Sequence, residues 1–255
     1  YLPPDEGGYE AFAPSALPLM DNWPAPTPLS AAAVSDVTQQ FVEAAQRAKH
    51  AGAKLIELHG AHGYLIHQFL SPITNRRNDE YGGSLPNRMR FALGVFEAVR
   101  AIWPDDLPIG MRVSATDWVD GGWSVEETVE LAKALEAIGC DYIHVSSGGL
   151  TTAQKIVVGP GYQTGFAETV KAAVDMPVIT VGQISEPLQA ETILRTGQAD
   201  MIALARPVIF NPRWVWHAAE ALGETVTYPR QYERGRPALW GAGGINQPGN
   251  RIPGK

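Results

Sequence analysis

Cysteine is almost missing from this chain of 255 residues, because Cys140 is the single one. One cysteine excludes an internal disulfide framework and fits a reducing compartment, so we expect a cytoplasmic protein. Long apolar runs are also missing, and none approaches the roughly 18 residues of a membrane-spanning helix. The first residues, YLPPDEGGYEAF, lack the basic and apolar regions of a signal peptide, so we expect no such leader.

Blocks of like charge are absent as well, and the net charge is −7. This distribution argues against nucleic acid or an anionic membrane as the main partner. No Gly-x-Gly-x-x-Gly motif follows an apolar run, so the sequence predicts no dedicated nicotinamide-binding domain. Apolar residues make up 45% of the chain and charged residues 18%, which is typical of a globular protein with a sizeable core.

Short apolar runs alternate with segments of helical periodicity from residue 34 onward. We expect strands over residues 53–60, 107–115, 140–149, 176–184 and 199–209, and helices over residues 34–52, 84–103, 124–139, 164–175, 186–197 and 212–223. Near-continuous apolar strands that alternate with amphipathic helices indicate a parallel sheet. Residues 1–30 contain seven prolines and are expected to be extended.

Polar or glycine residues stand where the predicted strands end: His59, Ser114, residues 146–149, Gly182 and Arg206. In a (β/α) barrel, chemistry is built at this end of the strands. A whole (β/α)8 barrel has eight strands in roughly 250 residues, whereas five are predicted here. The residues alone therefore leave two possibilities, an open doubly wound sheet or part of a barrel.

The segment ELHGAHGYLIHQF, residues 57–69, places His59, His62 and Tyr64 within six residues. Side chains alternate between the two faces of a strand, so the two histidines converge only if the strand ends and the chain turns. The glycines of the segment permit such a turn. We therefore expect the three side chains to line one pocket at the mouth of the sheet.

Three interpretations of this cluster remain open. The two imidazoles can donate N–H groups to a developing oxyanion while Tyr64 acts as a general acid. They can instead ligate a metal such as zinc, although the spacing is not His-Glu-x-x-His and no third ligand is obvious. They can also be polar residues that only cap a strand. His67, further along, is interpreted as structural.

The run HGAHGYLIHQFLSPITNRRNDEYGGSLPNR, residues 59–88, resembles the old yellow enzyme family of flavin-dependent ene-reductases. The resemblance continues in order through MRVSATDW, IHVSSGG, VITVGQI, LARPVIFNPRW and QYERG, and covers nearly the whole chain to about Arg236. The His-x-x-His form and the QYERG motif resemble the bacterial, thermophilic-like subgroup.

The resemblance implies an α/β fold, the (β/α)8 TIM barrel, of which this chain carries the fourth to eighth strands. Residues 1–236 would be the C-terminal part of a single FMN-binding barrel, and residues 237–255 a Gly- and Pro-rich tail or linker. The implied cofactors are FMN and, as hydride donor, NADPH or NADH. No metal is implied.

The resemblance also implies roles for the residues of the cluster. His59 and His62 would bind the oxygen of an activated alkene, and Tyr64 would protonate the alkene carbon. Hydride addition places negative charge on that oxygen, and two N–H donors stabilise charge that appears in the transition state. The implied substrates are enones, enals, maleimides and nitroalkenes, reduced by hydride from flavin N5.

The cofactor-binding residues implied by the resemblance are Arg112, Gly182, Gln183, Ala205 and Arg206. Arg112 would lie against the flavin pyrimidine edge, and the other four would form the phosphate site after the last two strands. Glycine lets a phosphate approach backbone N–H groups, and an arginine adds a bidentate donor.

Arg234 of QYERG would reach the active site of a neighbouring subunit, so the implied assembly is a homodimer or tetramer. The first three barrel strands of the family have no counterpart in the sequence. We expect either a second chain that carries these strands, or a segment absent from the sequence. A third explanation is circular permutation, in which the tail GGINQPGNRIPGK would stand just before Tyr1 in the unrearranged chain. A non-catalytic flavin-binding fragment also stays possible.

Overall fold

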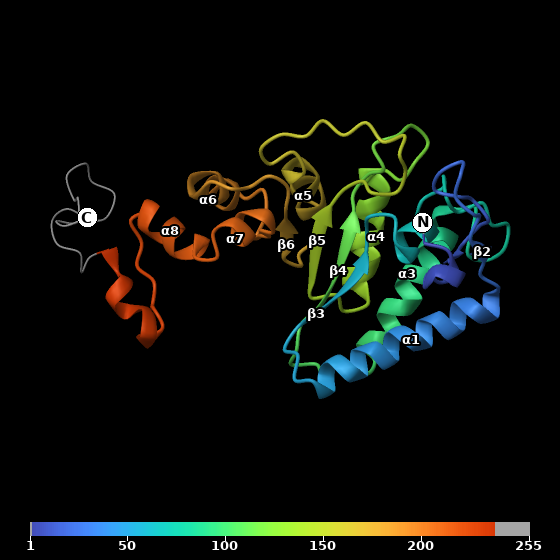
Figure 1. The fold of residues 1–255 in the computed structure, drawn as a ribbon, viewed down its shortest axis with the longest axis horizontal. Coiled ribbons are helices and arrows are strands. Elements are labelled where there is room, and N and C mark those ends of the chain that lie inside the picture. The colour runs from blue at the N-terminus through green and yellow to red at the C-terminus, as the bar shows by residue number, and fades with distance from the viewer. Residues whose placement is uncertain (1, 238–255) are drawn as a thin grey trace.

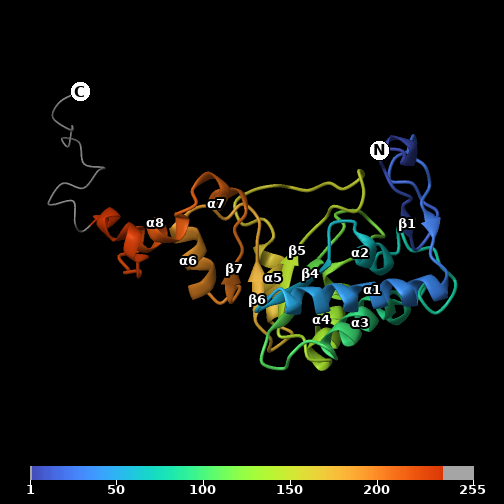
Figure 2. The ribbon, with the colours of Figure 1, turned by 60° about the horizontal axis from the view of Figure 1, so that its bottom comes forward.

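Five parallel strands form one sheet in the computed structural model, which describes residues 2–237. They are β3 (Ile56–Gly60), β4 (Ile109–Ser114), β5 (Tyr142–Ser146), β6 (Val178–Thr180) and β7 (Met201–Ile202). Their order in the sheet is their order along the chain, β3-β4-β5-β6-β7. Figure 1 labels β3 to β6, and Figure 2 labels β7 beyond β6. All five predicted strands are thereby confirmed, and β3 and β7 are the two edges of the sheet.

In the described part of the chain, six helices lie where the periodicity of the sequence predicted them. They are α1 (Ala31–His50), α3 (Leu85–Arg100), α4 (Val125–Ala137), α5 (Thr164–Lys171), α6 (Pro187–Arg195) and α8 (Trp214–Ala221). Helices α1, α3, α4 and α5 pack in succession along the sheet (Figure 2). Strand side chains that face these helices are fully buried, including Met111, Val113, Ile143 and Val145. None of the helices within residues 2–237 is long and apolar enough to cross a membrane.

Two short helices were not predicted. Helix α2 (Leu65–Leu70) follows the histidine–tyrosine segment, and α7 (Arg206–Phe210) occupies part of the strand predicted over residues 199–209. That prediction is wrong beyond residue 202. Pro207 explains the error, because proline has no N–H for a strand ladder but fits the first turn of a helix.

Helices α3 and α4 each have a serine at the N-cap. Ser124 forms a full capping box at the start of α4, in which its side chain accepts from the N–H of Glu127 and the Glu127 side chain accepts from the N–H of Ser124. Ser84 stands at the N-cap of α3, but its side chain makes no capping hydrogen bond. Residues 2–30 are mainly extended, with a one-turn 3-10 helix, η1 (Pro4–Glu6), and the small parallel pair β1 (Phe12–Ala13) and β2 (Thr27–Pro28).

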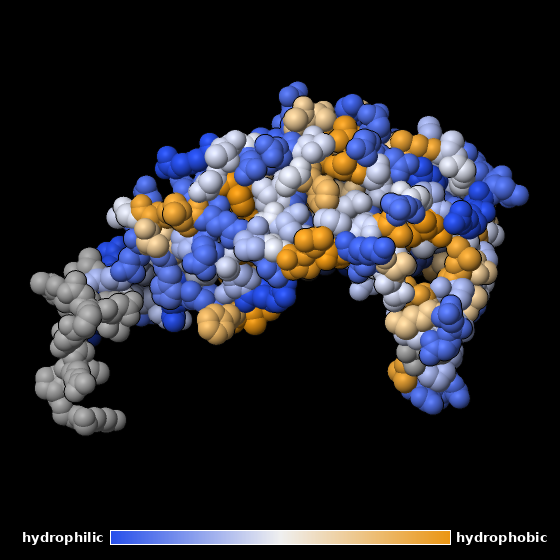
Figure 3. Space-filling model, turned by 90° about the horizontal axis from the view of Figure 1, so that it is seen from above, coloured by the Kyte–Doolittle hydropathy of each residue, from blue (hydrophilic) through white to orange (hydrophobic). Residues whose placement is uncertain are grey.

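The face of the sheet opposite the helices carries polar and charged side chains. His59, Arg112 and His144 stand side by side across β3, β4 and β5, because they are paired in register. Seen from the end at which the strands terminate, the molecule arches around a hollow, and apolar side chains reach the surface beside it (Figure 3). This arrangement corresponds to part of a barrel wall with its interior accessible.

Candidate active site

The histidine–tyrosine cluster forms where β3 ends. His59 is on the strand, and the chain then turns through two residues with left-handed backbone, His62 (φ 58°) and Gly63 (φ 77°). The turn brings the ring centroids of His59 and His62 to 5.1 Å, and those of His59 and Tyr64 to 5.3 Å. The predicted convergence of these three side chains is confirmed. Tyr64 is 64% exposed, so its phenol faces the mouth of the site.

Hydrogen bonds from neighbouring strands fix this turn. The backbone N–H of His62 donates to Ser114 Oγ over 3.0 Å, and Ser114 Oγ donates to the carbonyl of Gly148 over 2.9 Å. Backbone also approaches backbone closely, because a Cβ on Gly63 would lie 2.4 Å from the carbonyl oxygen of Gly149. The position of His62 therefore depends on the ends of β4 and β5 as well as on its own strand.

Both histidines of the cluster are neutral near pH 7. Burial, with a smaller contribution from the positive charge of Arg112, lowers the pKa of His62 to about 4. The same two causes lower the pKa of His59 from its ordinary value. Each ring therefore offers one N–H donor and one lone pair, and no positive charge.

Arg112 stands on β4 between His59 and His144. Its Nε atom is buried and has no hydrogen-bond partner within residues 2–237. A buried guanidinium nitrogen without a partner is costly, so an acceptor at this position would stabilise the site. An anionic or carbonyl-bearing ring edge, as in a flavin, fits this requirement.

A hydrogen-bonded pair of side chains below the cluster, His144 and Glu57, was missed in the sequence. His144 Nδ1 lies 3.1 Å from Glu57 Oε2, and the His144 side chain is 9% exposed. The Glu57 carboxylate also opposes the lowering of the Arg112 pKa that burial causes. The alternation of side chains along a strand could have revealed it, because Glu57 precedes His59 by two residues and so shares its face.

The four expected phosphate-site residues meet in one cavity. Gly182, Gln183, Ala205 and Arg206 line a space of about 350 Å³ between the loops that follow β6 and β7. Gly182 has a left-handed φ of 125°, and a Cβ there would lie 2.7 Å from Nε2 of Gln163, so only glycine fits. Arg206 in this cavity suits a phosphate, and the unpartnered Nε of Arg112 suits an acceptor on a ring edge, so the chemistry of these residues fits FMN.

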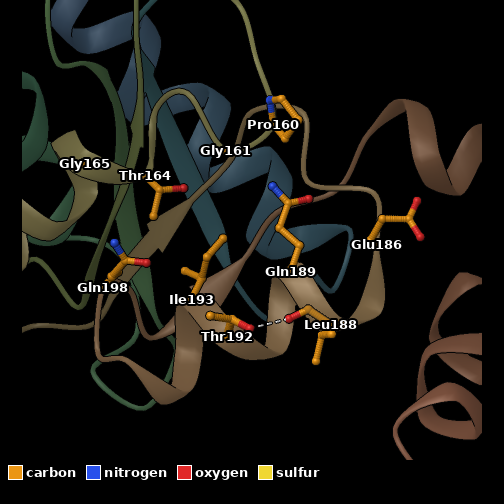
Figure 4. Close-up of a pocket in the computed structure, with 10 residues that line it drawn as sticks. All are labelled: Pro160, Gly161, Thr164, Gly165, Glu186, Leu188, Gln189, Thr192, Ile193 and Gln198. Carbon is orange, nitrogen blue, oxygen red and sulfur yellow. Dashed lines mark hydrogen bonds between the residues drawn. The ribbon is translucent and has the colours of Figure 1, made fainter.

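A second groove of about 600 Å³ lies between α5 and α6 (Figure 4). Its lining includes Thr164, Gln189 and Gln198 together with Leu188 and Ile193. It contains no lysine or arginine and none of the predicted site residues. This groove therefore does not match a phosphate site.

His67 is structural, as predicted. Its Nε2 lies 2.9 Å from Oδ1 of Asp117, and both side chains are fully buried. Its Nδ1 accepts a hydrogen bond from the N–H of Gly63, so His67 also supports the turn of the cluster. Within residues 2–237, no three His, Cys, Asp or Glu side chains come together in a metal-binding arrangement.

Arg234 is not brought to the cluster. It is exposed in the 3-10 helix η2 (Arg230–Gly235), at the end of the described chain that lies far from β3 (Figure 1). The neighbouring Arg213 stacks over the rings of Trp216 and Tyr232, which orders this end. Within one copy of the described chain, Arg234 therefore takes no part in this cluster. The tail over residues 238–255 lies outside the described residues.

Comparison with known proteins agrees with this geometry. Residues 11–224 match the family model described as NADH:flavin oxidoreductase / NADH oxidase family. An NADPH dehydrogenase of Geobacillus sp. (strain WCH70) is 47% identical over 226 residues, which cover 89% of this chain and 66% of that protein. One of Bacillus subtilis (strain 168) is 43% identical, with the same coverage. The chain thus spans slightly less than two thirds of the length of these relatives.

Solved structures show the same fold. A 2-naphthoyl-CoA reductase complex superposes with a TM-score of 0.77 at 29% identity, over 86% of this chain and 36% of that chain. Morphinone reductase superposes with a TM-score of 0.70 at 28% identity, over 87% and 62%. The expected TIM-barrel architecture, present here as a partial barrel, is confirmed. The chain belongs to the NADH:flavin oxidoreductase / NADH oxidase family, the old yellow enzyme family that its motifs resemble.

Proposed function

We propose that this protein is an FMN-dependent NAD(P)H:alkene oxidoreductase that reduces activated C=C bonds. The observation that carries the proposal is the convergence of His59, His62 and Tyr64 beside Arg112. Two neutral imidazoles and one exposed phenol are the groups needed to hold an electron-withdrawing oxygen and to deliver a proton. The names of relatives, NADPH dehydrogenase and morphinone reductase, support it.

Bound FMN supplies the redox chemistry, in which NAD(P)H is the two-electron donor and the alkene is the acceptor. Arg112 would hold the ring edge, and Gly182, Gln183, Ala205 and Arg206 would hold the phosphate. The same five residues were expected from the sequence.

His59 and His62 donate hydrogen bonds to the oxygen of an enone, enal, maleimide or nitroalkene. As hydride reaches one alkene carbon, negative charge develops on this oxygen, and the two donors stabilise it. The Tyr64 hydroxyl gives its proton to the other alkene carbon and is reprotonated from water. The products are the saturated compound and NAD(P)+.

Arg234 completes the substrate site from a neighbouring subunit in this proposal, which requires a homodimer or tetramer. Its exposure at one end of the described chain supports a contact with another molecule. No group of three or more potential metal ligands within residues 2–237 favours the metal-dependent alternative.

Replacing Tyr64 by Phe tests the proposal. We expect the alkene half-reaction to slow by about 10²–10⁴-fold, because a general acid typically contributes that much, whereas flavin reduction by NADPH keeps its rate. Stopped-flow absorbance of the flavin follows each half-reaction separately. Tyr81→Phe is the matched control, since Tyr81 packs on Phe69 away from the site. An unchanged alkene half-reaction in Tyr64→Phe would show that another group donates the proton.

A further inference from the structure

A chain of hydrogen bonds leads from His62 into the protein. His62 Nε2 lies 2.7 Å from Oγ of Ser146, the last residue of β5. Gln163 is the next member of the chain. Its Oε1 is 2.5 Å from Oγ of Ser147 and 3.4 Å from Oγ of Ser146. The two serines and the glutamine are all at most 6% exposed, so water does not supply alternative partners.

The donor and the acceptor in each of these hydrogen bonds can be assigned from two groups whose roles are fixed, the carbonyl of Val181 and the indole of Trp118. The carbonyl of Val181 only accepts, so Gln163 donates to it through Nε2 and turns Oε1 toward the serines. The indole of Trp118 only donates, and it donates to Ser147 Oγ over 2.9 Å. Ser147 must then use its own proton for Gln163 Oε1.

The proton of Ser146 has two possible acceptors. One is Gln163 Oε1, which is 3.4 Å away and already accepts the short bond from Ser147. The other is Nε2 of His62 at 2.7 Å. Hydrogen bonds from hydroxyl groups are strongest near 2.7–2.8 Å and weak at the longer distance, so the proton points to His62.

We propose that Ser146 is a positioning residue that holds His62 in the tautomer with its proton on Nδ1. Nδ1 makes no hydrogen bond to residues 2–237, and it is then the donor left for the substrate oxygen. The inference rests on the function proposed above and says which nitrogen of His62 performs it. In the opposite tautomer, Nδ1 would present a lone pair, which repels a developing oxyanion.

Because the pKa of His62 is low, its ring is neutral, and the tautomer decides which of the two nitrogens can donate. A protonated imidazole donates from both nitrogens, but a neutral one donates from a single nitrogen, which its second partner selects. The backbone hydrogen bond from His62 to Ser114 fixes the ring's attachment point, so the side chain cannot simply move to a new partner.

Nitrogen-15 NMR of histidine-labelled protein, loaded with FMN together with the segment that carries the first three barrel strands, tests the inference directly. In the wild type, the His62 signals should show a protonated Nδ1 and an unprotonated Nε2. His67 is an internal reference of opposite pattern, because its Nδ1 accepts from Gly63. A His62 with its proton on Nε2, or on both nitrogens, would overturn the inference without any variant being needed.

Variants then test the role of the serine. In Ser146→Ala, His62 should become a mixture of tautomers, and the alkene half-reaction should slow by about three- to tenfold, the worth of one net hydrogen bond. Ser146→Thr keeps a hydroxyl and should restore both the spectrum and the rate. His62 signals that are unchanged in Ser146→Ala contradict the proposal. Flavin reduction by NADPH, measured in the same samples, reports on the proposed function independently.

Discussion

Backbone strain in this protein is concentrated around the site. The non-glycine residues with left-handed backbone within residues 2–237 are His62, Trp118 and Gln183, and each follows the end of a strand. Such conformations cost about 1–3 kcal/mol and persist when surrounding contacts hold them. Here the contacts are specific, as in the bond from His62 N–H to Ser114. The strained backbone is thus found at the mouth of the barrel, where it directs side chains toward the site.

Mild acid is expected to destabilise the fold through His62. The folded pKa is about 4, below the ordinary 6.5, so between these pH values the unfolded chain binds a proton that the folded chain does not. The free energy of unfolding therefore falls as the pH drops through this window. Because the ring is partly exposed, we expect a loss on the order of 1–2 kcal/mol. Urea denaturation at about pH 7 and about pH 5 measures it.

His62→Asn is the matched variant for this measurement. Asparagine tolerates the left-handed backbone of the position and does not titrate. The loss between the two pH values should therefore be smaller in the variant than in the wild type. An equal loss in both proteins would assign the acid sensitivity to other groups.

Residue roles were predictable from the sequence only where a motif carries them. The cluster of His59, His62 and Tyr64 was recognisable because its members are close in sequence. Gln163 was not, because it lies in a loop and acts on residues that precede it by 16 and 17 positions. The pairing of Glu57 with His144 spans 87 positions and depends on which strands are neighbours.

Helices α3 and α4 differ in how much the N-cap residue stabilises the start of the helix. Helix α4 begins with a full capping box, whereas α3 begins at a serine whose side chain makes no hydrogen bond to the helix. In the sequence the two serines look alike, since each precedes an apolar helical pattern. In α3, proline at the second position lacks an N–H and sets the backbone angle, so the helix start depends less on the cap.

This difference gives a paired prediction. Ser124→Ala should lower the free energy of unfolding by about 1 kcal/mol, because it removes the acceptor for the N–H of Glu127. Ser84→Ala should stay within about 0.5 kcal/mol of the wild type, since Ser84 is exposed and makes no capping bond. Chemical denaturation of the two variants compares them. Equal losses would mean that the serine at α3 also acts as a cap.

The elements themselves were largely predictable, and the errors have local causes. Apolar runs located all five strands because the side chains that face the helices are buried and recur at alternate positions, as Met111 and Val113 do in β4 and Ile143 and Val145 do in β5. Helix α2 was missed because six residues are too few for a helical period to stand out. Helix α7 was taken for strand because its apolar run outweighed the signal of Pro207.

At the scale of the whole molecule, the sheet formed by residues 2–237 is incomplete as a barrel. Strands β3 and β7 each pair on one side, and the interior face exposes charged groups together with Met201, which is 40% exposed. A closed barrel has no such edges. We propose that a further polypeptide segment with the first three barrel strands pairs with both edges, on this chain or on a second one.

Flavin retention should depend on that segment. Residues 1–255 alone are expected to lose FMN during gel filtration and to bind a dye for exposed apolar surface. Co-expression with the N-terminal third of a relative should restore the flavin absorbance and reduce dye binding. A monomer of residues 1–255 that keeps one FMN would refute the need for the added strands.

The strand order β3-β4-β5-β6-β7 has a consequence for synthesis on the ribosome. Each strand that leaves the ribosome finds its pairing partner already made and still accessible at the growing edge. No later strand has to insert between two earlier ones, so the wall can assemble in step with translation. Closing the ring is then a late event, because β7, one of the two edges with which the added segment pairs, is the last strand of this sheet to be synthesised.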